Sequence, residues 1–249
     1  MVRRRVNMRF LVSLLGCLVG LCAVGGVVYF QWVLNQNPKR ALANAQRMLA
    51  AQNYEQAVKY YQDAVHLSPK DPQILVWMGN AYRAWGLVNE DVAMSSHDVE
   101  CYLRALQVDP DNLDALSKVM TIYVDEVEFR HSAQAFEGLK NTADKVVQLH
   151  PADLDLYHRA QAYAAIAPLA KWLSGIAVPP EEVDEHIKAL AELMKEDKFN
   201  PDVPYYLAQS YLNQAMERRR VGQNEEAKNK FHQAKAVFEE AIVAQPDSA

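Results

Sequence analysis

The sequence contains few of the residues that build reactive or metal-binding sites. Three of its 249 residues are cysteine, and two of these, Cys17 and Cys22, lie in one apolar run. Cys101 is then the sole thiol of the remaining chain, so no disulfide can form within that part. The cysteine content therefore does not distinguish an oxidising compartment from a reducing one.

Sequence motifs of catalysis are also missing. The nine glycines form no phosphate-binding loop, and the chain contains neither HExxH nor GxSxG. The seven histidines have no close cysteine partner, which gives metal binding little support. His150 and His158 bracket an expected turn, where contact with solvent or packing explains them better than ligation. We therefore expect no enzymatic activity, no cofactor, no metal and no small-molecule substrate.

Acidic residues are absent from residues 1–34, whereas Arg3, Arg4, Arg5 and Arg9 place four cations there. The rest of the chain holds the other 22 of the 26 Lys and Arg residues against all 31 acids, a formal charge of −9. A domain of this charge repels phosphate backbones, so nucleic acid is not an expected partner.

An apolar run without charge occupies residues 10–30 and continues to Leu34. Its first 21 residues would form a helix of roughly 31 Å, which matches the hydrocarbon core of a lipid bilayer. Tyr29 and Trp32 suit an interfacial aromatic belt, and the preceding cations favour an N-terminus inside the membrane. The sequence thus predicts a basic cytoplasmic N-terminus (1–9), a transmembrane signal-anchor helix (10–34) and a domain outside the membrane (35–249).

Other interpretations of this run stay open. Signal-peptide cleavage could use the small residues Ala23-Val24-Gly25, although the mature chain would then begin with an apolar tail. The stretch from Leu14 to Cys17 resembles a lipoprotein processing box, but Arg9 lies close upstream and more apolar sequence follows. Gly16 and Gly20 form a GxxxG motif that could pack against another membrane helix, although glycine is common in such spans.

A spacing pattern recurs along the domain outside the membrane. An aromatic residue is followed by alanine after three residues and by proline after five more, at Tyr61, Ala64 and Pro69, at Tyr102, Ala105 and Pro110, and at Phe238, Ala241 and Pro246. Pro69, Pro110 and Pro151 follow one another at intervals of 41 residues. Residues three apart share one helical face, where the aromatic ring fills a groove and the alanine admits a neighbouring helix. The proline then ends the helix.

A second helical stripe precedes three of the helices that end before a proline. Its residues are Leu75, Met78, Gly79 and Tyr82 in one repeat, Leu116, Val119, Met120 and Tyr123 in the next, and Leu207, Ala208 and Tyr211 in the last. Each repeat is therefore expected to be a pair of helices. No single pair can bury its apolar face alone, so neighbouring pairs should stack on one another.

The sequences LVWMGNAYRAWG (75–86) and CYLRALQVDP (101–110) resemble the two helices of a tetratricopeptide repeat (TPR). The resemblance covers most of residues 38–246 in about five units, and it implies an all-α, TPR-like solenoid of helical hairpins. Several units exceed the family period of about 34 residues. We expect their extra residues between the two helices, at 86–94 and 126–132.

Local signals locate several helix ends. Ser95 and Asp98 could form a capping box that opens the helix holding Cys101, and Pro180 followed by Glu181 suits a first turn. The last unit has longer helices, which we expect from Val203 to about Val221 and from Asn224 to Ala244.

The TPR resemblance implies that the first helix of each unit lines a concave groove that binds a peptide or helix of another protein. The aligned positions are Val76, Asn80, Arg83, Ser117, Thr121, Asp125, His158, Ala162, Tyr205, Gln209 and Asn213. Some TPR proteins clamp a terminal carboxylate with Lys and Asn, and the matching positions here hold Asn80 and Arg159 but also Val76 and Asp155. We therefore expect no clamp for acidic chaperone tails.

Two classes of function follow. In the first, the chain is a membrane-anchored TPR scaffold or adaptor that binds partner proteins outside the membrane, with residues 10–34 in a bacterial inner membrane and the repeats in the periplasm. In the second, it is a structural accessory subunit of a multi-subunit membrane complex, and residues 10–34 belong to the interface. Placement on an organelle outer membrane, with the repeats in the cytosol, fits the same sequence.

Overall fold

The computed structural model describes residues 37–89, 92–130, 132–195 and 200–244, except for the side chains of residues 92–95. The chain divides into two compact units, Met1–Val108 (unit 1) and Asp109–Ala249 (unit 2). The expected membrane helix, with Gly16, Gly20 and the alternative processing sites, lies outside the described residues. Within the described ranges, no helix combines the length and the apolarity needed to cross a membrane.

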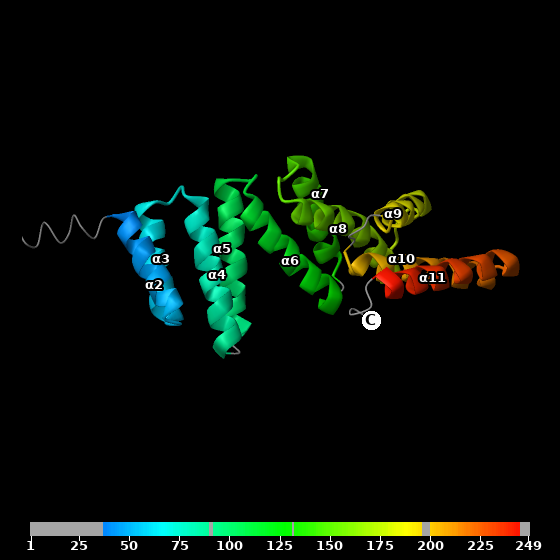
Figure 1. Ribbon diagram of the computed structural model, residues 1–249, viewed down its shortest axis with the longest axis horizontal. Helices are drawn as coiled ribbons and strands as arrows, with labels where there is room; N and C mark the ends of the chain where they lie inside the picture. The colour runs from blue at the N-terminus through cyan, green and yellow to red at the C-terminus, as the bar shows by residue number, and fades with distance from the viewer. Residues whose placement is uncertain (1–36, 90–91, 131, 196–199, 245–249) are drawn as a thin grey trace, which may run out of the picture. The chain divides into compact units, whose positions relative to one another are not determined.

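The described part of unit 1 consists of two antiparallel helical hairpins (Figure 1). The first pairs α2 (Pro38–Ala50) with α3 (Tyr54–Leu67), and the second pairs α4 (Pro72–Asn89) with α5 (Val92–Val108). Asn37 and Asn53 begin the two helices of the first hairpin. Their side-chain oxygens accept hydrogen bonds from the backbone N–H groups of Lys39 at 3.0 Å and Gln56 at 3.2 Å. In each case the asparagine oxygen pairs with a backbone N–H group that has no hydrogen-bond partner within the helix.

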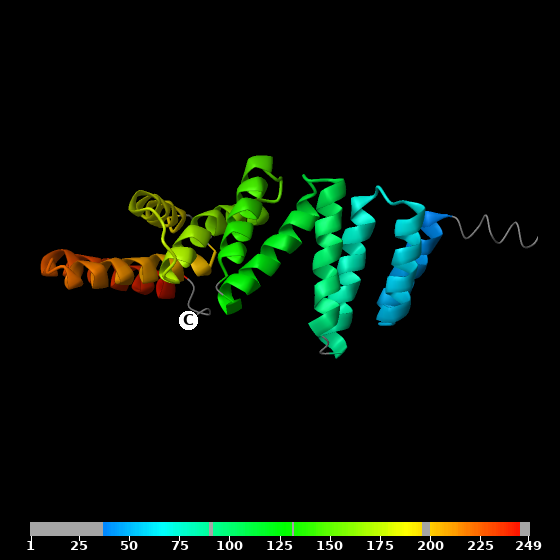
Figure 2. The same cartoon turned by 180° about the vertical axis from the view of Figure 1, so that it is seen from behind.

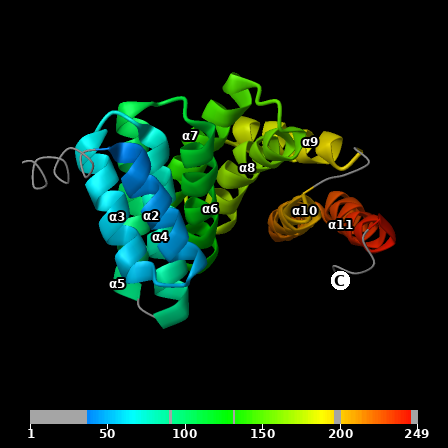
Figure 3. The ribbon, with the colours of Figure 1, turned by 60° about the vertical axis from the view of Figure 1, so that its left-hand side comes forward.

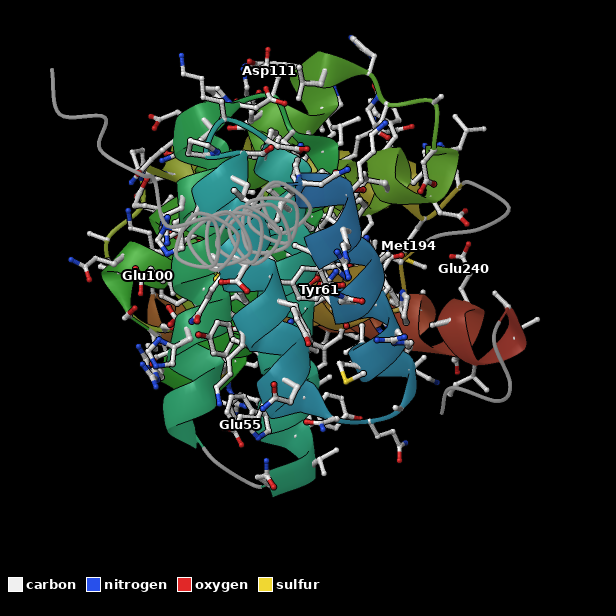
Figure 4. The ribbon with its side chains drawn as sticks, turned by 90° about the vertical axis from the view of Figure 1, so that its left-hand side faces the viewer. Glu55, Tyr61, Glu100, Asp111, Met194 and Glu240 are labelled. Atoms are coloured by element: carbon white, nitrogen blue, oxygen red, sulfur yellow. The ribbon has the colours of Figure 1, made fainter. Side chains whose placement is uncertain are left out.

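The core of unit 1 is built from the repeat residues of the sequence pattern. Tyr61 is buried, as are Ala57 and Ala64 on the same face of α3. Figure 4 shows Tyr61 lying among the helices, whereas Glu55 of the same helix lies at the outside. At the surface, Gln62 Nε2 donates a hydrogen bond to the Tyr82 hydroxyl at 3.1 Å, which links α3 to α4.

Unit 2 is also helical throughout its described residues. Its helices are α6 (Leu113–Arg130), α7 (Ala133–Leu149), α8 (Leu154–Leu173), α9 (Pro180–Leu193), α10 (Asp202–Arg220) and α11 (Asn224–Ala244). Neighbours in the sequence pack as hairpins, and Figures 2 and 3 show one of them, α10 and α11, side by side in orange and red. Helix α10 also packs against α8 and α9. The contact between α10 and α8 joins successive repeats and forms one wall of the groove described below.

Helix α8 lies at the centre of unit 2, because α7, α9 and α10 all pack against it. Its residues 165–170 are buried without interruption, and Phe136 and Leu139 of α7 and Leu190 of α9 are buried as well. Gln214 of α10 donates a side-chain hydrogen bond to Asp184 of α9 at 2.9 Å. Helices α7, α9 and α10 thus share α8 as their common packing partner.

The turn between α7 and α8 explains two of the histidines. His150 ends α7 in the left-handed conformation, with φ 45°. Its ring centroid lies 5.6 Å from that of Tyr157, and the His158 centroid lies 6.0 Å from the same ring. Both histidines thus pack against one tyrosine, in agreement with the packing role expected for them.

The extra residues of the long repeats extend the helices instead of forming loops. Helix α4 continues to Asn89 and α5 begins at Val92, while α6 continues to Arg130 and α7 begins at Ala133. The insertions expected at 86–94 and 126–132 are therefore wrong in form, because neither stretch contains a proline, or a glycine after Gly86, that would end a helix.

Three further helix ends can be compared with their expected positions. Ser95 lies inside α5, so the expected capping box is wrong. The first turn at Pro180 is confirmed, and α10 and α11 keep the expected bounds to within one residue. The sequence thus predicts a helix end correctly where a proline or a short polar segment marks that end.

Candidate partner-binding groove

A hollow of about 330 Å³ lies between α10 and the ends of α6 and α8 in unit 2. We refer to it as the α10 groove. Its lining residues are Val127 of α6, Ala170 and Leu173 of α8, Ser174 directly after α8, and Tyr205, Tyr206, Gln209, Asn213 and Met216 of α10. Such walls combine apolar surface with a few amide and hydroxyl groups, and this combination suits a ligand that must be both buried and oriented.

Helix α10 presents one stripe of side chains to the groove. Tyr205, Gln209, Asn213 and Met216 are four, four and three residues apart, so they lie on one helical face. Tyr205 is 54% exposed. The stripe therefore offers an aromatic ring, two amides and a flexible thioether to solvent.

Packing on the other side of α10 fixes the direction of this stripe. Val203, Leu207 and Ala208 are buried against the rest of unit 2. At the start of the helix, the Asn200 side-chain oxygen accepts a hydrogen bond from the backbone N–H of Asp202 at 2.9 Å. Rotation of α10 about its axis would expose the buried apolar side chains, so the groove residues keep their orientation.

Three carboxylates gather beside the N-terminal end of the α10 groove. Asp202 accepts a hydrogen bond from the Tyr163 hydroxyl at 2.9 Å. Glu128 follows the lining residue Val127, and its pKa is raised by burial first and then by the negative charges of Asp202 and Asp125. Each of these influences disfavours the charged form of Glu128. A cation placed here would relieve the repulsion.

Two tyrosines beside these carboxylates remain hydrogen-bond donors. Burial raises the pKa of Tyr206 to about 12, and the charges of Glu128 and Asp202 act in the same direction. The pKa of Tyr163 is likewise raised to about 12, chiefly by burial. Both phenols therefore keep their protons at neutral pH. The Tyr206 ring also supports Tyr205 in an edge-to-face contact with centroids 5.2 Å apart.

The opposite end of α10 carries the opposite charge. Arg218, Arg219 and Arg220 occupy its last turn, where cations interact favourably with the helix dipole. Arg218 lies 3.5 Å from Glu226 of α11. The charge along α10 therefore changes from negative at the Tyr205 end to positive beyond Met216.

The structure brings three of the expected groove residues of unit 2 together. Tyr205, Gln209 and Asn213 all line the α10 groove. Asp125 is exposed on α6 and contributes to the negative charge around Glu128.

The other expected residues of unit 2 have different surroundings. The Ser117 hydroxyl accepts a hydrogen bond from Arg159 at 3.3 Å, and the Thr121 hydroxyl donates to the Ser117 carbonyl at 3.0 Å. His158 packs against Tyr157. Ala162 is 1% exposed and belongs to the core, so its side chain is not available to a ligand. The resemblance placed it on the concave side, but α8 is covered from several directions.

The three expected residues of unit 1 lie on α4. Val76 is 1% exposed and is a core residue, so the expectation that its side chain contacts a partner is corrected. The Asn80 side-chain oxygen accepts a hydrogen bond from the Tyr102 hydroxyl at 2.9 Å. Arg83 is half-buried, and its positive charge lowers the pKa of Asp98 against the larger effect of burial. Asn80 and Arg83 thus also support the hairpin of α4 and α5.

Several groove residues were missed by sequence reasoning. Tyr206 and Met216 could have been found by extending the α10 stripe to its neighbouring positions. Val127, Leu173 and Ser174 gave no such signal, because they enter the groove only through the lengthened ends of α6 and α8. The sequence predicts extra residues between two helices at 126–132, whereas Val127 belongs to α6.

Metal-binding side chains do not cluster in the part of the chain that the structure describes. No group of three or more His, Cys, Asp or Glu residues there has an arrangement that could hold a metal ion.

Solved structures with the TPR fold resemble this chain. One is described as "Crystal structure of YrrB: a TPR protein with an unusual peptide-binding site"; it aligns with a TM-score of 0.56 and 17% identity over 85% of this chain and 88% of that chain. The crystal structure of MamA protein aligns with a TM-score of 0.54 and 12% identity over 84% of this chain and 92% of that chain. No family model and no curated relative matches the sequence. At these identities the likeness concerns the fold alone, and it confirms the TPR-like helical hairpins that the repeat pattern predicts.

Proposed function

We propose that the α10 groove binds a segment of another protein. The observation that carries the proposal is the exposed Tyr205 ring on a stripe that borders a hollow of about 330 Å³. A tyrosine in such a position can bury a large apolar surface against a partner at little cost in side-chain entropy, while its hydroxyl stays in contact with water. Gln209 and Asn213 can then pair with the backbone of the bound segment.

The charge beside the groove selects the segment. The charges of Asp202 and Asp125 act against the negative charge of Glu128, and this repulsion falls when a lysine or arginine side chain lies beside Glu128. The neighbouring tyrosine rings can also contact such a cation through their faces. We therefore propose a segment that places a basic residue at the Tyr205 end and an apolar residue against Leu173 and Met216.

The anchor remains part of the proposal. The uncharged run at 10–34 and the cations before it support a single membrane span with the N-terminus inside. The chain would then be a membrane-anchored scaffold that recruits partner proteins on the outer side of a bacterial inner membrane. The peptide-binding site named for the YrrB structure supports a protein partner.

A second candidate is an accessory subunit of a membrane protein complex. The observation that favours it is the pair Gly16 and Gly20, which would let another membrane helix approach closely. In that case the span and the groove both contact the complex.

Site-specific photo-cross-linking tests the groove. A benzophenone amino acid at position 205 of the full-length chain should form a stoichiometric cross-linked product in cells, whereas the same probe at Leu87, an exposed residue of unit 1, should not give that product. Equal products from both positions would show nonspecific contact and contradict the groove proposal.

Removal of residues 1–34 separates the two candidates. A chain that starts at Asn35 and reaches the same compartment through a cleavable signal keeps the cross-link at position 205 if the protein is a tethered scaffold. Loss of the cross-link in that chain, together with co-purification of other membrane proteins by the full-length chain, supports the accessory subunit.

A further inference from the structure

A hollow of about 500 Å³ lies on the first hairpin of unit 1, and we refer to it as the entry hollow. Its lining includes Arg40, Ala41 and Asn44 of α2 and Tyr60, Asp63 and Leu67 of α3. The α2 residues belong to the first two turns of that helix, and Leu67 is the last residue of α3. The entry hollow therefore lies at the end of the hairpin where the chain enters α2.

The entry hollow lies on a different side of α3 from the second hairpin. Gln62 and Val65 line a separate hollow of about 290 Å³ together with residues of α4 and α5. At about 100° per residue, Tyr60 and Asp63 lie about 100° or more around α3 from both of these residues. Among the described helices, α2 packs to a substantial extent against α3 alone. The entry hollow is thus a face of the first hairpin that the described part of the chain does not cover.

The second hairpin has a corresponding face, and a helix packs beside it. This face carries Met78 of α4 and Cys101 and Arg104 of α5, and α3 lines the same hollow with Gln62, Val65 and His66. Met78 and Cys101 are buried there. Helix α3 directly precedes this hairpin in the chain, so the preceding segment completes the packing of the hairpin.

The repeat spacing relates the two faces residue by residue. Positions are counted from the first residue of the first helix in each hairpin, and from the buried repeat tyrosine of the second helix. On this count Met78, Cys101 and Arg104 correspond to Asn44, Tyr60 and Asp63. The latter three residues all line the entry hollow. The first hairpin therefore presents the face on which the second hairpin receives the helix that precedes it.

The same register identifies the segment that would cover the entry hollow. Val65 and His66 precede the first residue of α4 by seven and six residues. Gln31 and Trp32 precede the first residue of α2 by the same numbers, and they lie outside the described residues. Residues 10–30 alone match the thickness of a bilayer, so the rest of the apolar run exceeds what a membrane span requires.

We propose that residues 31–34 pack against the entry hollow, with the Trp32 ring against Tyr60 and Leu67. Burial of the indole removes a large apolar surface from water. Arg40 is exposed in the first turn of α2, where its guanidinium can lie on the face of the indole. Unit 1 is then held directly at the end of the predicted membrane helix. The contact goes beyond the partner binding proposed for the α10 groove, which belongs to unit 2.

Disulfide trapping in the full-length chain tests the contact. Cys17 and Cys22 are first replaced by serine, and Gln31→Cys is combined with Asp63→Cys, so that Trp32 stays in place. Mild oxidation should join the two cysteines within one chain, and mass spectrometry of the non-reduced peptides measures the yield. Absence of this disulfide overturns the proposal.

Val33→Cys with Asp63→Cys is the matched control. Position 33 has nearly the same tether length to α2 as position 31, but it lies about 160° away around a continued helix. The control pair should therefore cross-link much less than the pair at Gln31 and Asp63. Equal yields from both pairs would indicate a segment that moves freely near the hollow, and they overturn the contact.

Trp32→Ala in the full-length chain gives a second test that needs no added cysteine. The amides of α2 and α3 should lose protection from hydrogen exchange, because their hairpin loses its cover, while those of α6 and α7 in the same sample keep theirs. Trp32→Phe should retain part of the protection. Unchanged protection of α2 and α3 in Trp32→Ala is the result expected of a ring that lies only in the membrane interface, and it overturns the proposal.

Discussion

A Cβ atom at Gly79 would lie 2.6 Å from the ring of Tyr102. Gly79 belongs to α4 and Tyr102 to α5, and the tyrosine side chain is fully buried. Its hydroxyl donates a hydrogen bond to Asn80 at 2.9 Å, so the ring cannot move away without losing that bond. The close approach of α4 and α5 thus depends on the lack of a side chain at Gly79, which leaves room for the Tyr102 ring.

Gly79→Ala should therefore destabilise unit 1. Alanine gains about 1 kcal/mol over glycine inside a helix. Forcing a methyl group into a packed contact costs about 1–3 kcal/mol, so the net change should be a loss. Hydrogen exchange of the α4 and α5 amides measures it, with Tyr102→Leu in the same chain as the variant that should restore part of the loss. Unchanged or stronger protection in Gly79→Ala would contradict the packing.

Unit 2 contains the same kind of contact with the roles of the two helices exchanged. Tyr123 lies on α6, and its ring occupies the space that a Cβ atom at Gly138 of α7 would take. Gly138→Ala is thus the matched control for the experiment on Gly79. It should lower the protection of α6 and α7 amides and leave that of α4 and α5 unchanged.

A buried carboxyl in unit 1 gives a prediction about pH. Asp98 is buried, and burial raises its pKa against the opposing effects of the Val99 backbone N–H and the Arg83 charge. Its Oδ1 atom has no hydrogen-bond partner among the described residues. The folded state therefore binds the proton more tightly than the unfolded state does. This contribution to stability is fully present below the unfolded pKa and is lost as the pH rises through the folded pKa.

Asp98→Asn should remove this dependence. The amide has nearly the same shape and no charge to bury, so unit 1 should be more stable at neutral pH than in the wild type. Thermal unfolding followed from about pH 4 to pH 8 measures the difference, which should shrink as the wild-type carboxyl becomes protonated. A variant that is less stable at neutral pH would show that the pairing of Asp98 with Arg83 outweighs its burial.

The repeat pattern predicts the helical hairpins because its signals are local. An aromatic residue, an alanine and a proline at fixed spacings specify a face and an end of one helix, as Tyr61, Ala64 and Pro69 do. The groove depends on contacts between repeats, which no local spacing reports. Val127 and Leu173 reach α10 only because α6 and α8 are longer than the family pattern. Likewise, Val76 and Ala162 align with concave positions, but neighbouring helices cover them.

Tyr205→Ala should weaken binding of the partner segment without affecting the fold. The ring is exposed, so its loss leaves the core of unit 2 unchanged. An aromatic side chain that becomes buried in an interface commonly contributes more than about 1 kcal/mol, and we expect a loss of affinity of about fivefold or more. Fluorescence anisotropy with the peptide identified by cross-linking measures it, and Phe129→Ala is the control. Equal losses in both variants would place the binding site elsewhere.

Binding of a basic segment should weaken as the pH falls. In the free protein, burial and the charges of Asp202 and Asp125 raise the pKa of Glu128, and a bound cation would lower it again. The bound state then holds fewer protons, so affinity is fully present above the raised pKa of the free groove and declines below it. Glu128→Gln should reduce the affinity at neutral pH and flatten this dependence. An affinity that stays constant on acidification would show that Glu128 does not face the cation.

Cys101 should react slowly with thiol reagents in the folded protein. It is 3% exposed, and burial raises the pKa of its thiol to about 12, so little thiolate forms at neutral pH.

A membrane-impermeant maleimide at Cys101 therefore cannot report the side of the membrane on which the repeats lie. Val221→Cys, at an exposed position after α10, can do so once Cys17 and Cys22 are replaced by serine. Labelling of Val221→Cys on intact bacterial cells with a permeable outer membrane would support repeats in the periplasm, and labelling only after lysis would contradict them. Rapid labelling of Cys101 in the native protein would contradict its burial.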